Sequence, residues 1–422
     1  PYFIQKCNNS MNMGEFEDLF TDSEDELPCG WEMRVTDSGR VYYVDHKSKT
    51  TQWKHPKNSR EKYLSPELPF GWSKASTEDG KIIFINHIEN RTTCIDPRIA
   101  YSMSDKKNAA MKFDSYSSAM VVLRGRDMRG ITALITGANS GIGFETALAL
   151  SLHGCHVILA CRTKIKGEQA ASLILKKQKI PIKVDVVECD LASLDSVKRC
   201  AETILLKKWA IKILICNAGV MGLPYSLSSD GIESTFAINH LGHFYLVNLL
   251  KDVLLSSAPA RVIIVSSESH RFPSLYGDTF EIRDVPMKKS DYISMVAYNQ
   301  SKLCNLLFAF ELNRRLESFG VTCNAVTPGC LISTSIQRHS YFYKLLFLLA
   351  RPFAKSQCQG ASTLVYCAAS LEMEGVGGFY FNNCAGCAPS QLSLNEQLAK
   401  ELWDFSEKLA FKKFDIDWLI NI

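Results

Sequence analysis

The stretch Ile131-Thr-Ala-Leu-Ile-Thr-Gly-Ala-Asn-Ser-Gly-Ile-Gly143 decides the fold of this chain. It begins with mostly apolar residues over 131–135, continues through a glycine-rich loop, and leads into helix-forming residues from Phe144 to Leu152. The order is that of a strand, a tight loop and a helix. Glycine lets a pyrophosphate approach the backbone, and the first helical turn offers free N–H groups and the positive end of its dipole. The stretch therefore predicts a dinucleotide-binding site.

The spacing of the glycines narrows this prediction. Thr-Gly-x-x-x-Gly-x-Gly is wider than the usual Gly-x-Gly-x-x-Gly fingerprint, and it resembles the short-chain dehydrogenase/reductase family. The resemblance implies that the loop contacts the cofactor. The implied contacts are Thr136, Gly137, Asn139, Ser140, Gly141, Ile142 and Gly143.

Strand and helix patterns alternate from residue 131 onward. This alternation predicts an α/β fold with a Rossmann-type, doubly wound parallel sheet. The later predicted strands cover 155–160, 182–188, 211–216, 261–265, 321–326 and 378–381, and a terminal helix covers 392–412.

The end of the second predicted strand indicates which cofactor is preferred. In this fold an acidic residue there bonds the adenine ribose of NAD, but this chain has Arg162, and a guanidinium suits a 2′-phosphate. We therefore expect NADP(H) to be preferred, with NAD(H) as the alternative. The family resemblance implies further cofactor contacts at Asp190, Asn217, Ala218, Gly219, Tyr298, Lys302, Pro328, Gly329 and Thr334.

The candidate catalytic residues lie around Tyr298-Asn-Gln-Ser-Lys302. Positions i and i+4 of a helix share a face, so the phenol and the ammonium should lie together. A free phenol has a pKa of about 10, and an adjacent cation should lower it. The resemblance implies that Tyr298 is the general acid/base, that Lys302 tunes it, and that Ser267 binds the substrate oxygen. It also implies that Asn239, on a long helix, holds a water near the lysine.

Two neighbouring histidines and two further segments bear on this site. His240 and His243 are expected to be structural. Residues 268–290 form an insertion between Ser267 and Tyr298 that resembles the retinol-dehydrogenase-like branch. The aromatic segment 341–347 predicts a lid over an apolar, steroid- or retinoid-like substrate, with a plain core helix as the alternative.

The N-terminal third contains an internal repeat, because Leu-Pro-x-Gly-Trp occurs at Trp31 and again 41 residues later at Trp72. Each copy predicts three short strands, which in the first copy cover 32–36, 41–45 and 50–53. Trp31 and Trp53 are 22 residues apart, and Pro56 follows three residues later. This pattern resembles the WW domain, a family that binds proline-rich peptides on an aromatic groove.

The two copies differ in the groove. The resemblance implies a peptide site for Pro-Pro-x-Tyr ligands in the first copy, made of Tyr42, Val44, His46, Lys49, Thr51 and Trp53. In the second copy Ile83 replaces the groove tyrosine and Cys94 replaces the groove tryptophan. We expect that copy to be mainly structural and to steady the first.

These patterns divide the chain into six parts. They are an acidic disordered tail at 1–26, WW domain 1 at 27–58, a polar linker at 59–66, WW domain 2 at 67–99, a second linker at 100–128, and the dehydrogenase domain at 129–415. Because residue 1 is Pro, Met11 or Met13 is a candidate initiator.

Composition excludes several classes of function. The net charge is only +4, so we expect no direct binding of nucleic acid. The 15 cysteines lie mostly in apolar runs, as expected for reduced thiols, and their spacing predicts no metal site. No apolar run is long enough for a transmembrane segment. The expected location is the cytoplasm, with the nucleus as a second possibility.

Paired WW repeats before a dehydrogenase leave two hypotheses open. In the first, the chain is an oxidoreductase for a small apolar alcohol or carbonyl, and the WW module targets it. In the second, it is mainly a signalling adaptor in apoptosis, growth and transcription control, whose dehydrogenase domain is a cofactor-binding platform. The resemblance implies Pro-Pro-x-Tyr proteins as partners, including transcription regulators.

Overall fold

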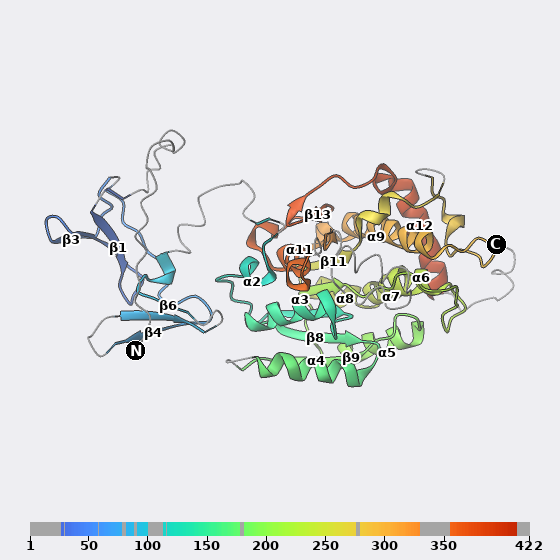
Figure 1. Ribbon diagram of the computed structural model, residues 1–422, viewed down its shortest axis with the longest axis horizontal. Coiled ribbons are helices and arrows are strands. Elements are labelled where there is room, and N and C mark those ends of the chain that lie inside the picture. Colours follow the sequence, from blue (N-terminus) through green and yellow to red (C-terminus); the bar gives the residue numbers. More distant parts are fainter. Residues whose placement is uncertain are drawn as a thin grey trace. The chain divides into compact units, whose positions relative to one another are not determined.

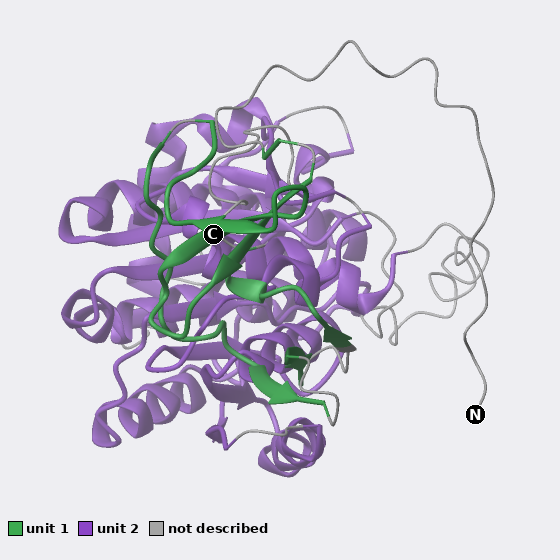
Figure 2. Cartoon of the chain, turned by 90° about the vertical axis from the view of Figure 1, so that its left-hand side faces the viewer, with its two compact units in different colours: residues 1–107 green, residues 108–422 purple. Residues whose placement is uncertain are grey.

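The computed structural model describes residues 27–329 and 355–411, apart from 29, 58, 78–81, 88–90, 100–112, 115, 178–180 and 276–278. The chain divides into two compact units, residues 1–107 and 108–422 (Figure 2). The acidic segment 1–26, Thr334 and the predicted lid at 341–347 lie outside the described residues.

The first unit contains two three-stranded antiparallel sheets, as the two WW-like repeats predict (Figure 1). Their strands are β1 (Trp31–Val35), β2 (Val41–Asp45) and β3 (Thr50–Gln52), then β4 (Trp72–Ser76), β5 (Ile82–Asn86) and β6 (Arg91–Thr93). Gly39, in the turn between β1 and β2, has a φ of +84°. A Cβ at this position would lie 2.1 Å from the carbonyl oxygen of Leu64, so only glycine fits.

The segment after the first sheet is more than the solvated linker that the sequence predicts. Backbone bridges pair Tyr63 with Arg40 and Glu61 with Lys54. The N–H of Leu64 also donates to the carbonyl oxygen of Gly39 at 2.8 Å. The edges of such a short sheet have backbone groups that need hydrogen-bond partners, and this segment provides partners for some of them. Residues 60–64 therefore fold as part of the first WW domain.

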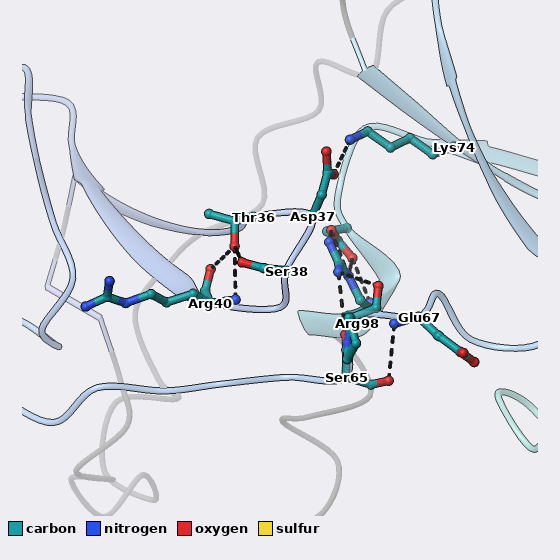
Figure 3. A network of polar contacts seen from close by, with 10 residues as sticks. Thr36, Asp37, Ser38, Arg40, Ser65, Glu67, Lys74 and Arg98 are labelled. Atoms are coloured by element: carbon teal, nitrogen blue, oxygen red, sulfur yellow. Dashed lines mark hydrogen bonds and ion pairs between the residues drawn. The ribbon is translucent and has the colours of Figure 1, made fainter.

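Charged side chains connect the two WW copies (Figure 3). The ammonium of Lys74, on β4, lies 2.5 Å from a carboxylate oxygen of Asp37, in the turn of the first copy. The buried guanidinium of Arg98 pairs with Asp96 at 2.7 Å and donates to the carbonyl oxygen of Pro66 at 3.2 Å. The first contact joins the two copies, and the Arg98 contacts join the second copy to the segment before it.

The second unit is built on an eight-stranded sheet with the order β14-β13-β12-β11-β10-β7-β8-β9. All neighbouring strands are parallel except β13 and β14, so the predicted doubly wound fold is confirmed. The strands are β7 (Thr132–Thr136), β8 (His156–Cys161), β9 (Val184–Glu188), β10 (Ile213–Cys216), β11 (Ala260–Val265), β12 (Val321–Thr327), β13 (Tyr380–Asn382) and β14 (Ala385–Gly386).

Helices cover both faces of this sheet (Figure 1). Alternate strand residues point to opposite faces, so Leu134 of β7 joins one core cluster and its neighbours Ala133 and Ile135 join the other. The first cluster packs on α5 (Leu194–Leu206), α7 (Gly242–Leu249), α9 (Ser294–Leu316) and α12 (Glu396–Phe411). The second packs on α2 (Ala119–Val122), α3 (Gly141–Leu152), α4 (Lys164–Lys176) and α11 (Gln357–Ala369).

Short helical elements complete the unit. They are α6 (Ser234–Phe236), α8 (Lys251–Ser256), and 3-10 turns at Glu268–Arg271, Ile282–Asp284, Glu317–Phe319, Leu371–Met373 and Gln391–Leu394. The terminal helix therefore starts at Glu396, later than predicted, because a separate turn precedes it.

The strand order reverses between β7 and β10. From β7 the sheet grows through β8 and β9 in one direction, and from β10 it grows through β11, β12 and β13 in the other. The chain segments that follow β7 and β10 therefore lead away from each other. The carboxyl ends of these two strands border the place where doubly wound sheets bind ligands.

Candidate active site and peptide groove

The glycine loop between β7 and α3 can accept a pyrophosphate. Gly137 and Gly141 have positive φ angles of 65° and 61°. A Cβ at Gly143 would lie 2.5 Å from the side-chain nitrogen of Asn217 and 2.6 Å from the carbonyl oxygen of Gly137, so a side chain there would disrupt the loop. Within the described residues, the N-cap Ser140 makes no side-chain bond to the helix. The first-turn N–H groups therefore suit an anion.

Thr136 and Asn217 hold this loop to the neighbouring strand. The buried hydroxyl of Thr136 accepts the N–H groups of Asn217 and Ala218 at 2.9 and 3.0 Å. The side-chain amide of Asn217 donates to the carbonyl oxygen of Thr136 at 2.9 Å. Thr136, a predicted cofactor contact, is buried and joins the two loops.

The remaining predicted cofactor residues lie at the carboxyl ends of the strands. Arg162 is exposed directly after β8. Asp190 is half-buried after β9, and its carboxylate accepts the N–H of Ala192 at 3.1 Å. Ser140 is exposed, whereas the other residues of this set are half-buried: Asn139, Ile142, Gly219, Pro328 and Gly329.

Tyr298 and Lys302 lie one turn apart on α9, and both are buried. The Tyr298 hydroxyl is hydrogen-bonded to the side chain of Ser267. The Lys302 ammonium donates to the carbonyl oxygen of Val265 at 3.1 Å and lies 5.6 Å from the centroid of the Tyr298 ring. The structure thus brings the three predicted catalytic side chains into one site.

The pKa of Tyr298 differs from the prediction. Burial raises it to about 12, while the hydrogen bond from Ser267 acts in the opposite direction. Burial also lowers the pKa of Lys302 to about 8. Desolvation penalises the charged form of both groups, and the ammonium is bonded to a backbone carbonyl instead of the phenol. The expected lowering of the phenol pKa by the lysine is therefore wrong for the chain alone.

Asn239 lies in a π-helical turn, Ala237–Leu241, and not in the regular long helix that the sequence predicts. Its side chain is held on both sides. The carbonyl oxygen of the amide accepts the N–H of Val220 at 2.8 Å, and the nitrogen donates to the backbone oxygen of Val220 and to the hydroxyl of Ser301 at 3.0 and 2.9 Å. π-Helical turns are frequent at functional sites.

Gly219 borders both Asn239 and Lys302. A Cβ at Gly219 would lie 3.3 Å from the side-chain oxygen of Asn239 and 3.5 Å from the ammonium of Lys302. The lack of a side chain at this position keeps the space beside the two polar groups free.

His270, which sequence reasoning missed, ties the turn after Ser267 to the C-terminal segment. Its Nδ1 lies 2.6 Å from the carbonyl oxygen of Ser267, and its Nε2 lies 3.0 Å from the N–H of Ser390. A carbonyl requires a donor and an N–H requires an acceptor, so the ring is neutral with the proton on Nδ1. The Ser-x-x-His spacing is too common to have identified this contact.

The first WW copy presents an aromatic pair on the sheet. The rings of Tyr42 and Trp53 lie 5.9 Å apart with an interplanar angle of 66°, and Trp53 is 43% exposed. Val44 lies opposite Thr51 in the register. The His46 ring is exposed and bonded through Nε2 to Glu32 at 2.8 Å, and Lys49 is also exposed.

Arg40 adds to this groove in a way that the sequence does not predict. Its guanidinium lies 4.2 Å from the centroid of the Trp53 ring and 3.0 Å from the carboxylate of Glu61. A cation over the face of an indole is an attractive contact that orients the ring. In the second copy, Ile83 lies on β5 and Cys94 is exposed just after β6.

Two features are absent from the described residues. None of their helices combines the length and the apolar character that a membrane crossing requires. Their histidine, cysteine and acidic side chains form no group of three or more that could hold a metal ion.

Comparison with known families agrees with this geometry. The short chain dehydrogenase family matches residues 131–277, and the WW domain family matches residues 27–56. A solved structure of an uncharacterized protein from Mycobacterium paratuberculosis is 34% identical, with a TM-score of 0.53, over 68% of this chain and 96% of that one.

Curated relatives extend the likeness over most of the chain. Retinol dehydrogenase 12 of Mus musculus is 44% identical over 66% of this chain and 86% of its own length. The WW domain-containing oxidoreductase of Drosophila melanogaster is 45% identical over 92% of this chain and 96% of its own length. The protein of that name from Homo sapiens is 52% identical, with coverages of 92% and 95%. With its WW-like sheets and its dehydrogenase fold, the chain belongs to the WW domain-containing oxidoreductases of the short-chain dehydrogenase/reductase family.

Proposed function

We propose that the second unit is an NADP(H)-dependent oxidoreductase that interconverts an apolar alcohol and its carbonyl. The observation that carries this proposal is the group formed by the buried Tyr298 and Lys302 with the half-buried Ser267, in which the phenol and the serine hydroxyl are already hydrogen-bonded. A phenol and a hydroxyl side by side can bind one substrate oxygen and move a proton to or from it.

Each residue of this group has a distinct task. Ser267 binds the substrate oxygen and orients it toward the phenol. Tyr298 donates the proton when a carbonyl is reduced and accepts it when an alcohol is oxidised. Lys302 lies beside the phenol on the same face of α9 and is a candidate contact for the cofactor. The nicotinamide, when bound, supplies or accepts the hydride.

The residues around the glycine loop fit a dinucleotide. The first turn of α3 can bind the pyrophosphate, because Gly143 leaves room for the loop and Ser140 leaves the helix N–H groups to a ligand. Arg162, exposed after β8, suits the 2′-phosphate of NADP(H).

The relatives support an apolar substrate. Retinol is an apolar alcohol, and retinol dehydrogenase 12 of Mus musculus is 44% identical over its matched part. We therefore place retinoids, steroids and other apolar carbonyls first among the substrates to test.

The direct test is turnover by the full chain. NADPH oxidation and NADP reduction should be followed over a panel of retinoids, steroids and medium-chain carbonyls, with Tyr298→Phe as the control. We expect turnover that the variant loses by roughly a hundredfold or more. Cofactor binding without any difference between wild type and variant would favour the adaptor hypothesis.

We further propose that the first WW copy binds Pro-Pro-x-Tyr proteins, and that the chain acts as an adaptor in the cytoplasm and nucleus. The exposed Trp53 beside Tyr42 supports this second function, because such a pair can receive a proline. Transcription regulators of growth and apoptosis are the partners to test. A Pro-Pro-x-Tyr peptide should shift the amide resonances around Tyr42, and equal shifts around Ile83 would contradict the assignment to the first copy.

A further inference from the structure

His243 connects the cofactor loop to Asn239. The ring is fully buried near the start of α7, directly after the π-helical turn. Its Nε2 lies 2.9 Å from the hydroxyl of Thr136, and its Nδ1 lies 3.1 Å from the backbone oxygen of Asn239. No regular element contains all three residues, because Thr136 ends β7 and lies 107 residues earlier in the chain.

The partners fix the protonation state of this histidine. The backbone oxygen of Asn239 can only accept, so Nδ1 carries the proton. The hydroxyl of Thr136 already accepts two N–H groups, those of Asn217 and Ala218, so its own hydrogen is left to donate. Nε2, at 2.9 Å, is a closer acceptor than the carbonyl oxygen of Ile215, at 3.4 Å, so the hydrogen points to Nε2. The ring is therefore neutral, in agreement with a pKa that burial lowers to about 4.

A single directed chain of hydrogen bonds results. It runs from the N–H groups of residues 217 and 218 through the Thr136 hydroxyl and the His243 ring to the backbone oxygen of Asn239. The side chain of Asn239 is bound to Val220 and Ser301, so both its backbone and its amide are fixed. In a buried setting such a chain is rigid, since breaking one bond leaves a polar group without a partner.

We propose that His243 is a positioning residue, which couples the dinucleotide loop to Asn239 through this chain. This role rests on the proposed oxidoreductase function. From the sequence alone, His243 is expected to be only structural. The proposed role predicts that an intact ring at position 243 is needed for tight NADP(H) binding as well as for turnover, because the ring bonds to both Thr136 and Asn239.

His240 is a matched control. It lies one turn earlier and is equally buried, but its Nε2 bonds to the hydroxyl of Ser406 on α12. Its ring packs among Phe236, Phe244 and Phe308. Replacing His240 should disturb the core by a similar amount while leaving the chain of hydrogen bonds intact.

The experiment compares His243→Phe, His243→Gln, Thr136→Val and His240→Phe in the full chain. The dissociation constant of NADPH is measured by fluorescence, alongside the unfolding midpoint. We expect His243→Phe and Thr136→Val to weaken binding by about tenfold each, and the double variant to be little worse than either single one. His243→Gln can still donate and accept, so it should restore most of the affinity. His240→Phe should bind NADPH like the wild type at a comparable loss of thermal stability.

A second measurement does not depend on the cofactor. The ¹⁵N spectrum of histidine-labelled protein should show a neutral ring with the proton on Nδ1 whose signals disappear in His243→Gln and change in Thr136→Val. The signals of His270, which also carries its proton on Nδ1, should remain in both variants. This readout also holds if a phenylalanine variant fails to fold.

The outcomes separate the inference from the function on which it rests. Equal losses of affinity in His243→Phe and His240→Phe, additive losses in the double variant, or a proton on Nε2 would each overturn the inference. Failure of the wild type to bind NADPH or NADH would overturn the proposed function, while the tautomer and its response to Thr136→Val would still decide whether the chain of hydrogen bonds exists.

Discussion

The ammonium of Lys302 lies 5.6 Å from the centroid of the Tyr298 ring, yet it donates its hydrogen bond to the backbone oxygen of Val265. The two side chains share one face of α9, but each is buried and each disfavours its charged form. At pH 7 the phenol is neutral, so the cost in stability comes from burying the ammonium, as expected for a group placed for chemistry and not for folding.

Replacing Lys302 by methionine should stabilise the chain at pH 7 and abolish turnover. The folded pKa is about 8, below the ordinary value of 10.5, so folding below pH 8 buries a charged ammonium. Burying this charge costs at most about 3 kcal/mol. The gain in the variant is smaller than this, because methionine also loses the hydrogen bond to Val265. The cost fades as the pH rises from 8 to 10.5, because the folded chain then sheds the proton while the unfolded chain keeps it. Denaturant unfolding of both proteins should show an advantage of the variant at pH 7 that shrinks toward pH 10. A less stable variant at pH 7 would contradict this account.

Gly219→Ala should reduce turnover while the fold is retained. The added Cβ would lie 3.3 Å from the side-chain oxygen of Asn239 and 3.5 Å from the ammonium of Lys302, which is close but does not require the backbone to move. It would fill the space beside the two groups. Steady-state kinetics should show a lower kcat at a nearly unchanged melting temperature. Gly386→Ala, whose Cβ would meet only Phe381 at 3.9 Å, is the control. Wild-type kinetics in Gly219→Ala would show that the space is not used.

Gly143→Ala should abolish cofactor binding. Its Cβ would overlap the side-chain nitrogen of Asn217 and the carbonyl oxygen of Gly137, at 2.5 and 2.6 Å, so the loop must shift. We expect the affinity for NADPH to fall by roughly a hundredfold or more, since the anion site depends on the position of this backbone. Calorimetric titration measures the change, and retained affinity would mean that the pyrophosphate binds elsewhere.

Arg162→Asp should shift the cofactor preference from NADPH toward NADH. The guanidinium after β8 can bind a 2′-phosphate, whereas a carboxylate repels it and can bond the ribose hydroxyls. The ratio of the two dissociation constants is the measurement. Lys198→Asp makes the same charge change at an exposed position on α5 and should leave the ratio as it is. An unaltered ratio in Arg162→Asp would remove the argument for NADP(H).

Restoring both aromatics in the second WW copy should create a second peptide site. The double change Ile83→Tyr and Cys94→Trp rebuilds the pair that Tyr42 and Trp53 form in the first copy. In a background of Trp53→Ala, which removes the first groove, binding of a Pro-Pro-x-Tyr peptide should reappear in a fluorescence titration. Continued absence of binding would show that the backbone of the second copy, and not its side chains, prevents recognition.

The strands, and the placement of Tyr298 and Lys302 on one helix, could be predicted because they depend on short-range information. Apolar runs such as 213–216 form strands of the central sheet, and Tyr298 and Lys302 share a helix face by spacing alone. The contacts of Thr136 with His243 and of Arg40 with Trp53 could not be predicted, since each joins residues that only the folded chain brings together. The pKa of Tyr298 was predicted in the wrong direction, because burial cannot be read from the spacing of a motif.

The backbone pairing of residues 60–64 with the first sheet determines where that domain ends. A fragment that stops at residue 56, the limit of the family match, would keep Tyr42 and Trp53 but lose Glu61, the counter-ion of the arginine that lies on the indole. It would also expose the backbone of Gly39 and Val41 to water. Peptide affinities measured on so short a fragment would therefore describe a different groove, and the two repeats are best expressed, crystallised and compared as one piece.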